Sequence, residues 1–247
     1  VLSLHNLILD YKVKITRNFT DGLENVHREI GRKTEVFMCT KERYEFLKEH
    51  GAVILLEKPE EKMEEVFDCM IETDRLIIRP LKNADYKNWL NAFENRFPSK
   101  YKHDKGKMDM SECTEEWFAN LVKKHQELAL NDIAHVFGIF LKDDGKHLGI
   151  VDFSTLARDV FQWGRIGYTI HNQFWQKGYG KEAVKSALLI GFRDLNFHRI
   201  EAHINTDNLP SIHLANSVGM KYECMREGFI YEYEEWTDHL VYYINAQ

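Results

Sequence analysis

The stretch that most constrains the fold runs from Tyr168 to Ala187 and reads YTIHNQFWQKGYGKEAVKSA. It begins with a β-type run, turns at Gly178 and Gly180, and continues as a helix. Apolar residues recur at close to helical period after the glycines, at Ala183, Val184, Ala187, Leu188 and Leu195. A strand that leads through a tight turn into a helix predicts a crossover to a parallel strand, here Arg199 to Asn205.

The start of this helix has the properties of an anion site. A helix that opens directly after glycines presents unpaired backbone N–H groups, and its dipole favours negative charge there. Lys177 and Lys181 add positive charge, and no acidic residue precedes Glu182 in the turn. The segment therefore predicts a phosphate cradle. It lacks the spacing of a P-loop, which argues against a bound nucleoside triphosphate.

Two other interpretations of the same stretch stay open at this point. Gly178 to Ala183 fits the dinucleotide pattern G-x-G-x-x-A, and Glu201 lies roughly twenty residues further on, where a ribose-binding acid is expected. The fit is incomplete, because His171 to Lys177 separate the strand from the first glycine. The other interpretation is an ordinary turn between a strand and a helix, in which the glycines allow the backbone to bend and bind no ligand.

Composition limits the classes of protein to consider. The 247 residues hold one large domain, or one medium and one small domain. The net charge of −6 argues against a general nucleic-acid binder. The four cysteines form no C-x-x-C pair, which indicates reduced thiols rather than disulfides or a zinc site. No apolar run has the length of a membrane span, and Asp10 and Lys12 interrupt any signal peptide, so we expect a cytoplasmic protein without metal.

Residues 1–72 are expected to form a small α/β domain of alternating strands and helices. The expected strands are Tyr11–Thr16, Glu35–Cys39 and Ala52–Leu56, and the expected helices are Asp21–Ile30, Thr40–Gly51 and Pro59–Met70. No catalytic constellation occurs in this block. Its role is open between packing or oligomerisation and the sensing or guiding of a ligand.

Residues 73–247 are expected to form an α+β domain around a mixed sheet. After a strand that ends at Pro80, helices are expected from Asn83 and Thr114, on either side of a long polar loop, 97–112. Three strands of an antiparallel meander then follow: Ala134–Leu141, His147–Leu156 and Phe161–Ile170. Beyond the crossover we expect a helix from Asn208 to Gly219 and an antiparallel pair, Met220–Arg226 and Tyr231–Asn245.

Two polar surfaces in this domain suggest binding functions. Along Arg199–Asn205, alternation places Glu201 and His203 on one face, which suits a ligand cleft better than a packed core. The segment 227–238 carries five acidic residues, consistent with a solvated hairpin or with attraction for a cationic acceptor.

The order of these landmarks resembles that of the GNAT acetyltransferases, and among them the RimJ/RimL type. The resemblance covers Thr73 to the C-terminus and excludes residues 1–72. The residues that carry it are TDRLIIRPL from Thr73 with Asp85, Ile166–Tyr168, Trp175–Ala183, Asn205 with Asn208 and Ser211, Gly219-Met220, and Asp238 with Tyr242. Trp175 departs from the general family motif at a position where the RimJ/RimL branch does so too.

The resemblance implies a GNAT fold and acetyl-coenzyme A as co-substrate. The pantetheine arm would lie beside Ile170 and His171, and Asn208 and Ser211 match positions that contact the coenzyme. The pyrophosphate would lie on the backbone N–H groups of Gln176, Lys177, Gly178, Tyr179, Gly180 and Lys181. A primary amine of a protein N-terminus, a polyamine or an aminoglycoside would attack the thioester directly. A homodimer is compatible with these features.

The resemblance leaves the proton-transfer groups open. Glu201, His203 and His171 are candidates for the base, and a backbone N–H near Ile170 or His171 for the oxyanion donor. Ala215 stands where many family members have a tyrosine that acts as the acid for the leaving thiolate. Ser211 or Ser217 would have to take that role here. The alternatives are an acyl-coenzyme A sensor without catalysis and, less favoured, an NAD(P)-binding oxidoreductase.

Overall fold

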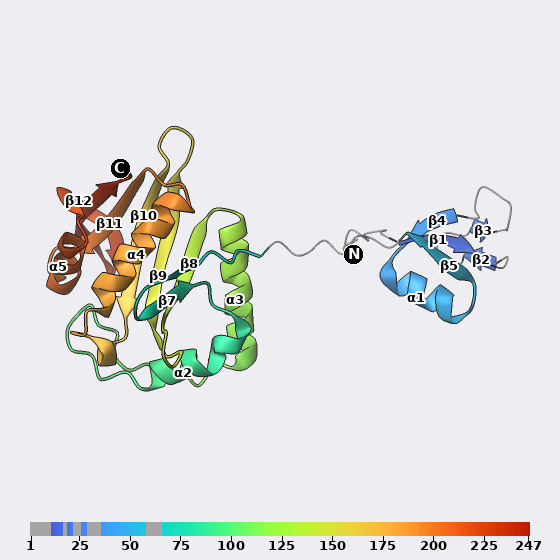
Figure 1. Cartoon of the computed structure of the whole chain (residues 1–247), viewed down its shortest axis with the longest axis horizontal. Coiled ribbons are helices and arrows are strands. Elements are labelled where there is room, and N and C mark those ends of the chain that lie inside the picture. The colour runs from blue at the N-terminus through green and yellow to red at the C-terminus, as the bar shows by residue number, and fades with distance from the viewer. Residues whose placement is uncertain (1–10, 17–18, 22–25, 29–35, 58–65) are drawn as a thin grey trace. The chain divides into compact units, whose positions relative to one another are not determined.

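The computed structural model describes residues 11–16, 19–21, 26–28, 36–57 and 66–247. The chain divides into two compact units, Val1–Glu65 and Val66–Gln247 (Figure 1). The large unit begins before residue 73, because β6 (Ile71–Glu72) pairs antiparallel with β7 (Leu76–Arg79) and so belongs to its sheet.

The small unit contains an antiparallel sheet of order β4–β1–β5 with helix α1. Val13, Phe37 and Leu47 are buried between sheet and helix. Thr40 caps α1 because its hydroxyl accepts a hydrogen bond from the backbone N–H of Arg43. These elements confirm the corresponding predictions, with bounds β1 Tyr11–Ile15, β4 Val36–Cys39, α1 Lys41–Glu49 and β5 Val53–Glu57.

The helix expected at Asp21–Ile30 is wrong. β2 (Phe19–Asp21) and β3 (Val26–Arg28) are strands that pair antiparallel, and the rest of that range lies outside the described residues. Aromatic and β-branched residues such as Phe19, Thr20 and Val26 favour strands, and here this preference outweighs the weak helical spacing.

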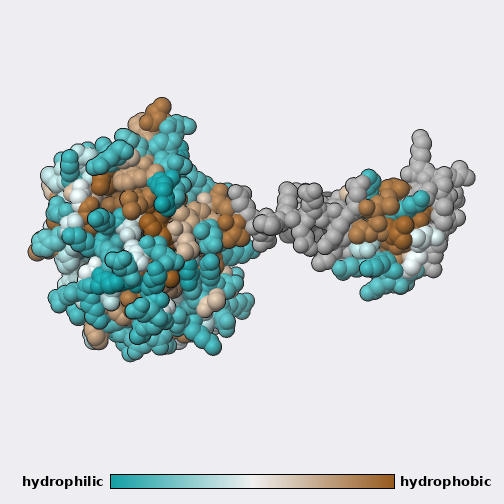
Figure 2. All heavy atoms as spheres, viewed as in Figure 1, coloured by the Kyte–Doolittle hydropathy of each residue, from teal (hydrophilic) through white to brown (hydrophobic). Residues whose placement is uncertain are grey.

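The other side of the small sheet carries exposed apolar residues. Val36 and Met38 alternate with buried Phe37 and Cys39 on β4, and Ile54 and Leu56 are exposed on β5. Figure 2 shows hydrophobic residues gathered on this unit, and also at the β9–β10 loop that projects at the top of the large unit, where Val160 and Phe161 are exposed.

The large unit is built on an eight-stranded sheet of order β12–β13–β11–β10–β9–β8–β7–β6. β10 and β11 are parallel, and every other neighbouring pair is antiparallel, which confirms the predicted meander and crossover. The remaining strands are β8 Ala134–Leu141, β9 His147–Ala157, β10 Trp163–Ile170, β11 Arg199–Asn205, β12 Lys221–Glu232 and β13 Glu235–Asn245.

Helices cover the two faces of this sheet separately. Leu76 and Ile78 of β7 pack in the main core with α4, whereas Ile77, between them, packs with α2 and α3. We call these sides the α4 face and the α2/α3 face. The helical elements are η1 Asn83–Asp85, α2 Tyr86–Glu94, α3 Glu115–Leu130, η2 Asn172–Phe174, α4 Tyr179–Arg193 and α5 Leu209–Ser217.

The helix expected at Pro59–Met70 is not present where its residues are described. Residues 66–70 have no helical structure, and residues 59–65 lie outside the described ranges. The side-chain amide of Gln126 on α3 donates to the carbonyl of Phe67 and accepts from its N–H. These bonds hold the segment along α3 in place of an internal helical ladder.

In the described part of the chain, no helix combines the length and apolar character that crossing a membrane requires. The same residues contain no group of three or more His, Cys, Asp or Glu side chains placed to hold a metal ion.

Candidate active site

The parallel pair of central strands separates part of the way along its length. β10 and β11 pair only from Trp163 to Arg165 and from Arg199 to Glu201, although β10 continues to Ile170 and β11 to Asn205. Beyond Arg165, the edge of β10 therefore has no partner strand. We call this opening the splay. A strand edge without a partner can accept an extended ligand as an additional strand.

The direction of the backbone groups identifies which of them face the splay. The N–H of His171 donates to the carbonyl of Leu148 at 2.8 Å, on the β9 side. Because successive residues direct their backbone groups to opposite edges, Ile170 directs its N–H into the splay. The expected oxyanion donor can therefore be Ile170, whereas His171 is already engaged.

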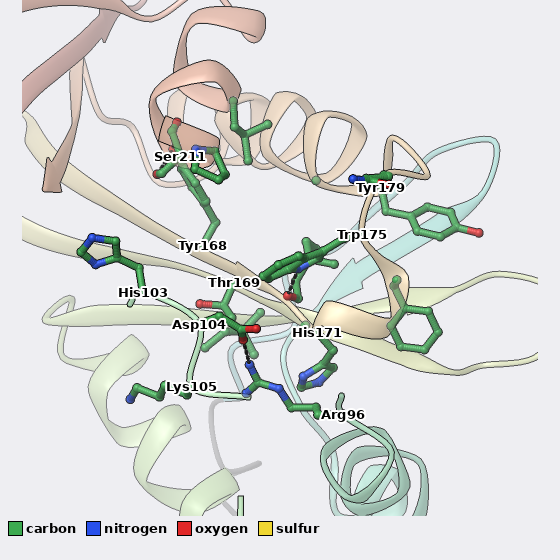
Figure 3. A pocket seen from close by; sticks show the side chains of 18 of the residues that line it. Arg96, His103, Asp104, Lys105, Tyr168, Thr169, His171, Trp175, Tyr179 and Ser211 are labelled. Carbon is green, nitrogen blue, oxygen red and sulfur yellow. Dashed lines mark hydrogen bonds and ion pairs between the residues drawn. The ribbon is translucent and has the colours of Figure 1, made fainter. Parts of the chain in front are cut away.

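A cavity of about 630 Å³ lies at the splay (Figure 3). It has two walls that come from different parts of the chain. The first wall, from β10, α4 and α5, includes Tyr168, Ile170, Gln176, Gly178, Gly180 and Ser211. The second wall, mainly from the segment after α2, includes Phe93, Arg96, Tyr101, His103, Asp104 and Met108.

The first wall contains the uncapped start of α4. Gly178 is the N-cap residue with φ +80°, and no side chain caps the helix. Gln176 also has a positive φ, +62°, so the turn bends sharply just before the helix. Because the first N–H groups of a helix have no internal partner, this end of the cavity offers donors and a positive dipole to an anion.

Arg75 fastens this turn from the side. It donates to the carbonyl of Lys177 at 3.1 Å and to the Glu182 carboxylate at 2.7 Å, and its guanidinium lies 4.6 Å from the centre of the Tyr179 ring. Burial alone would raise the pKa of Glu182, but hydrogen bonds from Thr73 and Arg75 lower it below its ordinary value. Glu182 thus stays ionised and holds Arg75 beside the anion site.

A pair of hydroxyl groups lies where α5 meets β10. Asn208 caps α5 by accepting from the N–H of Ser211 at 3.3 Å. The Ser211 hydroxyl donates to the Tyr168 oxygen at 3.0 Å, and the Tyr168 hydroxyl donates to the Ser211 carbonyl at 3.2 Å. Burial raises the pKa of Tyr168, so this phenol is protonated at neutral pH.

The second wall is held by a buried polar network. Asp104 accepts from Arg96 at 3.1 Å and from the Asn172 amide at 2.9 Å, and the Arg96 and Asp104 side chains are 5% and 0% exposed (Figure 3). The carboxylate also accepts from the N–H groups of Lys100 and Gly106. The predicted 97–112 loop is therefore an ordered part of the cavity, fixed to the segment that follows β10.

A second fastening joins this loop to the opposite side of the splay. His103 Nε2 lies 2.6 Å from an Asp207 carboxylate oxygen, in the turn between β11 and α5. Its Nδ1 lies 3.5 Å from the Tyr233 hydroxyl in the β12–β13 turn. The loop thus connects the ends of both separated strands across the cavity.

Two buried histidines lie behind the cavity. His171 Nε2 lies 3.1 Å from His147 Nδ1, and Phe93 packs edge-on against the His171 ring. Burial lowers the pKa of His147 to about 4 and that of His171 to about 3. Both rings are therefore neutral at physiological pH. A conjugate acid of such low pKa makes His171 a poor general base for an ammonium group.

The expected coenzyme-binding residues are largely brought together. Lys177 and Lys181 are not among the residues that line the cavity, although the carbonyl of Lys177 is held by Arg75. The residues that do line it are Ile170, His171, Gln176, Gly178, Tyr179, Gly180, Asn208 and Ser211.

Glu201, expected as a base, lies elsewhere. Its side chain is 2% exposed and does not line the cavity. It accepts from Arg199 at 2.8 Å and contacts His203 at 2.9 Å, so both oxygens have partners. The predicted alternation of the strand is confirmed, because Ile200 faces the core. However, the polar face of β11 forms an ion-pair cluster within the protein and not the expected ligand cleft. Because its oxygens are occupied there, Glu201 is also unable to bind a ribose.

Sequence reasoning did not identify the residues that order the second wall. Asn172 lies 68 residues beyond Asp104 in the sequence, and only the folded chain brings it to the Arg96–Asp104 pair. The loop length was the one available signal, because long ordered loops are often functional.

Comparisons with known proteins agree with this geometry. A family model described as an acetyltransferase (GNAT) domain matches residues 75–221. The uncharacterized N-acetyltransferase p20 of Bacillus licheniformis is 27% identical over 169 residues, which cover 68% of this chain and 89% of that protein. The ribosomal protein uS5-alanine N-acetyltransferase of Escherichia coli (strain K12) is 26% identical over 173 residues, covering 69% of this chain and 88% of that protein.

A solved structure shows the same fold. Mycobacterium smegmatis RimJ in complex with CoA-disulfide matches with a TM-score of 0.58 and 22% identity, over 69% of this chain and 82% of that one.

Proposed function

Because this chain belongs to the GNAT acetyltransferase family, we propose that it binds acetyl-coenzyme A at the splay and transfers the acetyl group to a primary amine. The observation that carries this proposal is the open edge of β10 next to the uncapped start of α4. An extended pantetheine arm needs a strand edge, and a pyrophosphate needs N–H donors. The two features lie along one cavity.

The residues present fit the coenzyme. The backbone N–H groups at the start of α4 would hold the pyrophosphate, with Arg75 beside them. The open edge at Tyr168 would pair with the amide groups of the arm, because the carbonyl of Ile170 already accepts from the Trp175 indole N–H at 2.6 Å. That the related RimJ structure contains a coenzyme A disulfide supports this assignment.

The chemistry requires an oxyanion donor and a stabilised leaving group. The Ile170 N–H faces the splay and would donate to the carbonyl oxygen as it becomes negative. The Tyr168 and Ser211 hydroxyls would hydrogen-bond the departing sulfur. The pKa of a free thiol is about 8.5, below that of Tyr168, so Tyr168 would stabilise the thiolate rather than protonate it fully.

We assign the acceptor to the class of N-terminal α-amines of proteins. An α-amine has a pKa of about 8 and is partly neutral at pH 7.5, whereas a lysine-type amine near 10.4 is almost fully charged. The Escherichia coli relative, an N-acetyltransferase for the alanine of ribosomal protein uS5, supports this class. The acidic residues Glu227, Glu232, Glu234, Glu235 and Asp238 would attract a basic segment behind such a terminus.

The test is the release of free coenzyme A from acetyl-coenzyme A by the full chain. Peptides that begin with alanine or serine, polyamines and aminoglycosides would be supplied in parallel, with N-acetylated peptides as controls. We expect release with α-amine peptides and none with their acetylated forms. Equal release without any acceptor, or no release with all of them, would reject the proposed transfer.

A further inference from the structure

One carboxylate near the splay has no hydrogen-bond or ion-pair partner among the residues that the structure describes. Asp152 lies on β9 directly opposite Gly167 of β10. None of the hydrogen bonds and ion pairs found within the described ranges of the chain involves its carboxylate, which is half-buried. A buried or half-buried carboxylate normally has a partner, because removal from water penalises its charge. The structure therefore leaves the function of Asp152 to be explained.

The position of this carboxylate is defined by Gly167. A Cβ atom at Gly167 would lie 2.7 Å from Asp152 Oδ1 and 3.0 Å from Oδ2. The carboxylate therefore occupies the space that a side chain at 167 would fill, and it leans from β9 over β10. Neighbouring strands are about 4.8 Å apart, so the carboxylate lies within about one strand spacing of the open edge of β10.

Asp152 is also on the face from which an acceptor can approach. Val151 and Phe153 pack in the core on the α4 face, so Asp152 points to the α2/α3 face. Asp152 itself does not line the cavity, but Ile150 and Thr169, which point to that same face, do line it, and Thr169 is exposed. The start of α4, by contrast, lies on the other side of the sheet with α4 itself. The coenzyme and the amine would thus meet across the splay.

The charged groups around Asp152 do not neutralise it. Arg165, on the same face of β10, donates to Ser154 and forms no ion pair with Asp152 within the described residues, and its charge only partly offsets the effect of burial on the pKa of Asp152. Glu201 and His203, on the same face of β11, are paired with each other. Lys105 lines the cavity from the loop. Burial raises the pKa of Asp152 above its ordinary value, which brings its basicity closer to that of the group it would serve.

We propose that Asp152 binds the ammonium group of the acceptor and accepts one of its protons. This proposal rests on the acetyl transfer proposed above and assigns the base of that reaction. Proton transfer to Asp152 leaves a neutral amine, whose nitrogen forms a bond to the thioester carbonyl carbon. The C–S bond then breaks, and coenzyme A leaves as the thiolate. The thiolate takes up the second proton of the nitrogen, directly or through water, and Asp152 returns its proton to solvent.

The main variant is Asp152→Asn, which keeps size but removes charge and basicity. At pH 7 we expect kcat/KM for an alanine-initiated peptide to fall about 10²- to 10³-fold, the range of a lost general base. The KM for acetyl-coenzyme A is expected to stay within about twofold. The control is Asp144→Asn, an exposed carboxylate in the β8–β9 turn that contacts Lys146, and it should change neither value. A fall of less than about threefold in Asp152→Asn would overturn the assignment.

Two further measurements separate this role from a structural one. Asp152→Asn should melt at the same temperature as wild type or higher, because it removes a charge that burial disfavours. Its kinetic defect should shrink as pH rises to about 9, where an α-amine of pKa about 8 is mostly neutral. A lower melting temperature together with a defect that is equal at both pH values would mean that Asp152 serves the fold.

Direct binding gives a result that does not depend on turnover. The ¹³C carboxyl signal of Asp152 would be followed in the wild-type chain with coenzyme A while the alanine-initiated peptide is added. We expect a shift with this peptide and none with its N-acetylated form. If no amine releases coenzyme A but this shift occurs, the transfer fails and the ammonium site stands. If release occurs without the shift, Asp152 is not the acceptor-binding group.

Discussion

Asp104 offers the sharpest test of how the cavity is built, through the variant Asp104→Asn. One carboxylate oxygen accepts from Arg96 and Gly106, and the other accepts from Lys100 and Asn172. An amide keeps one acceptor oxygen and places an NH₂ group against two of these donors. The variant therefore leaves two donors without an acceptor and removes the charge that balances Arg96.

The magnitude follows from burial. Each buried donor left without a partner costs about 1–3 kcal/mol, and breaking a buried ion pair by removing one partner costs about 3–5 kcal/mol. Two such donors cost about 2–6 kcal/mol, a range that contains the ion-pair figure, so we expect a loss of roughly 3–5 kcal/mol because the two side chains are 5% and 0% exposed. For a unit of this size, about 2–4 °C of melting temperature corresponds to each kcal/mol, so we expect a decrease of about 6–20 °C.

The assay is thermal unfolding together with the KM for acetyl-coenzyme A, which should rise because the second wall loses its fastening. Asp109→Asn is the matched control, since Asp109 is on the same loop but fully exposed. It should melt within about 2 °C of wild type. A double-mutant cycle with Asn172→Ala should show a coupling of at least about 0.5 kcal/mol. An unchanged melting temperature in Asp104→Asn, or fully additive effects, would refute the reasoning.

Three other outcomes are expected. Gly178→Ala should lower the free energy of unfolding by about 1–2 kcal/mol because the backbone at Gly178 is left-handed, and it should also weaken binding of acetyl-coenzyme A in calorimetry. The control is Gly219→Ala, where φ is +92° and the space around the glycine is open, and it should lower stability alone. Burial holds the pKa of His147 at about 4. Between pH 6.5 and 4, His147 therefore binds a proton in the unfolded chain but not in the folded chain. Stability should therefore fall from pH 6.5 towards 4 by up to about 1.4 kcal/mol per pH unit for this residue, and His147→Leu should flatten melting temperature against pH in that window. Glu201→Gln should cost about 1.5–3 kcal/mol, measured by urea unfolding, without the loss of amine turnover expected for Asp152→Asn.

The elements of the large unit could be predicted because their signals are local. Alternation along β11 and the glycines before α4 depend only on neighbouring residues. In the helix caps, the side chains of Thr114 and Asn208 accept from backbone N–H groups only three residues further on. The helix predicted over Pro59–Met70 is wrong at residues 66–70 for the opposite reason. Its backbone is bonded to Gln126, and no local pattern reports a partner so distant in sequence.

The residues of the site divide in the same way. The first wall of the cavity could be predicted because a glycine turn with a helix start is a continuous motif. Glu201 was a reasonable candidate from alternation, but alternation gives only the face of a strand and not the charges that meet there. Arg199 and His203, on the same strand, occupy its two carboxylate oxygens. Asp152 could not be predicted from the sequence, because the position of its carboxylate depends on Gly167 on the neighbouring strand.

The geometry of the splay gives the two proposed substrates a common meeting place in the sheet. If β10 and β11 stayed paired to their ends, Ile170 and its neighbours would bond to β11 and offer nothing to a ligand. Because they separate, the sheet gains an internal edge that is reached from both faces. The loop held by Asp104 and His103 then spans this gap. Loosening the loop should therefore impair coenzyme binding and transfer together, whereas removing the Asp152 charge should impair transfer alone.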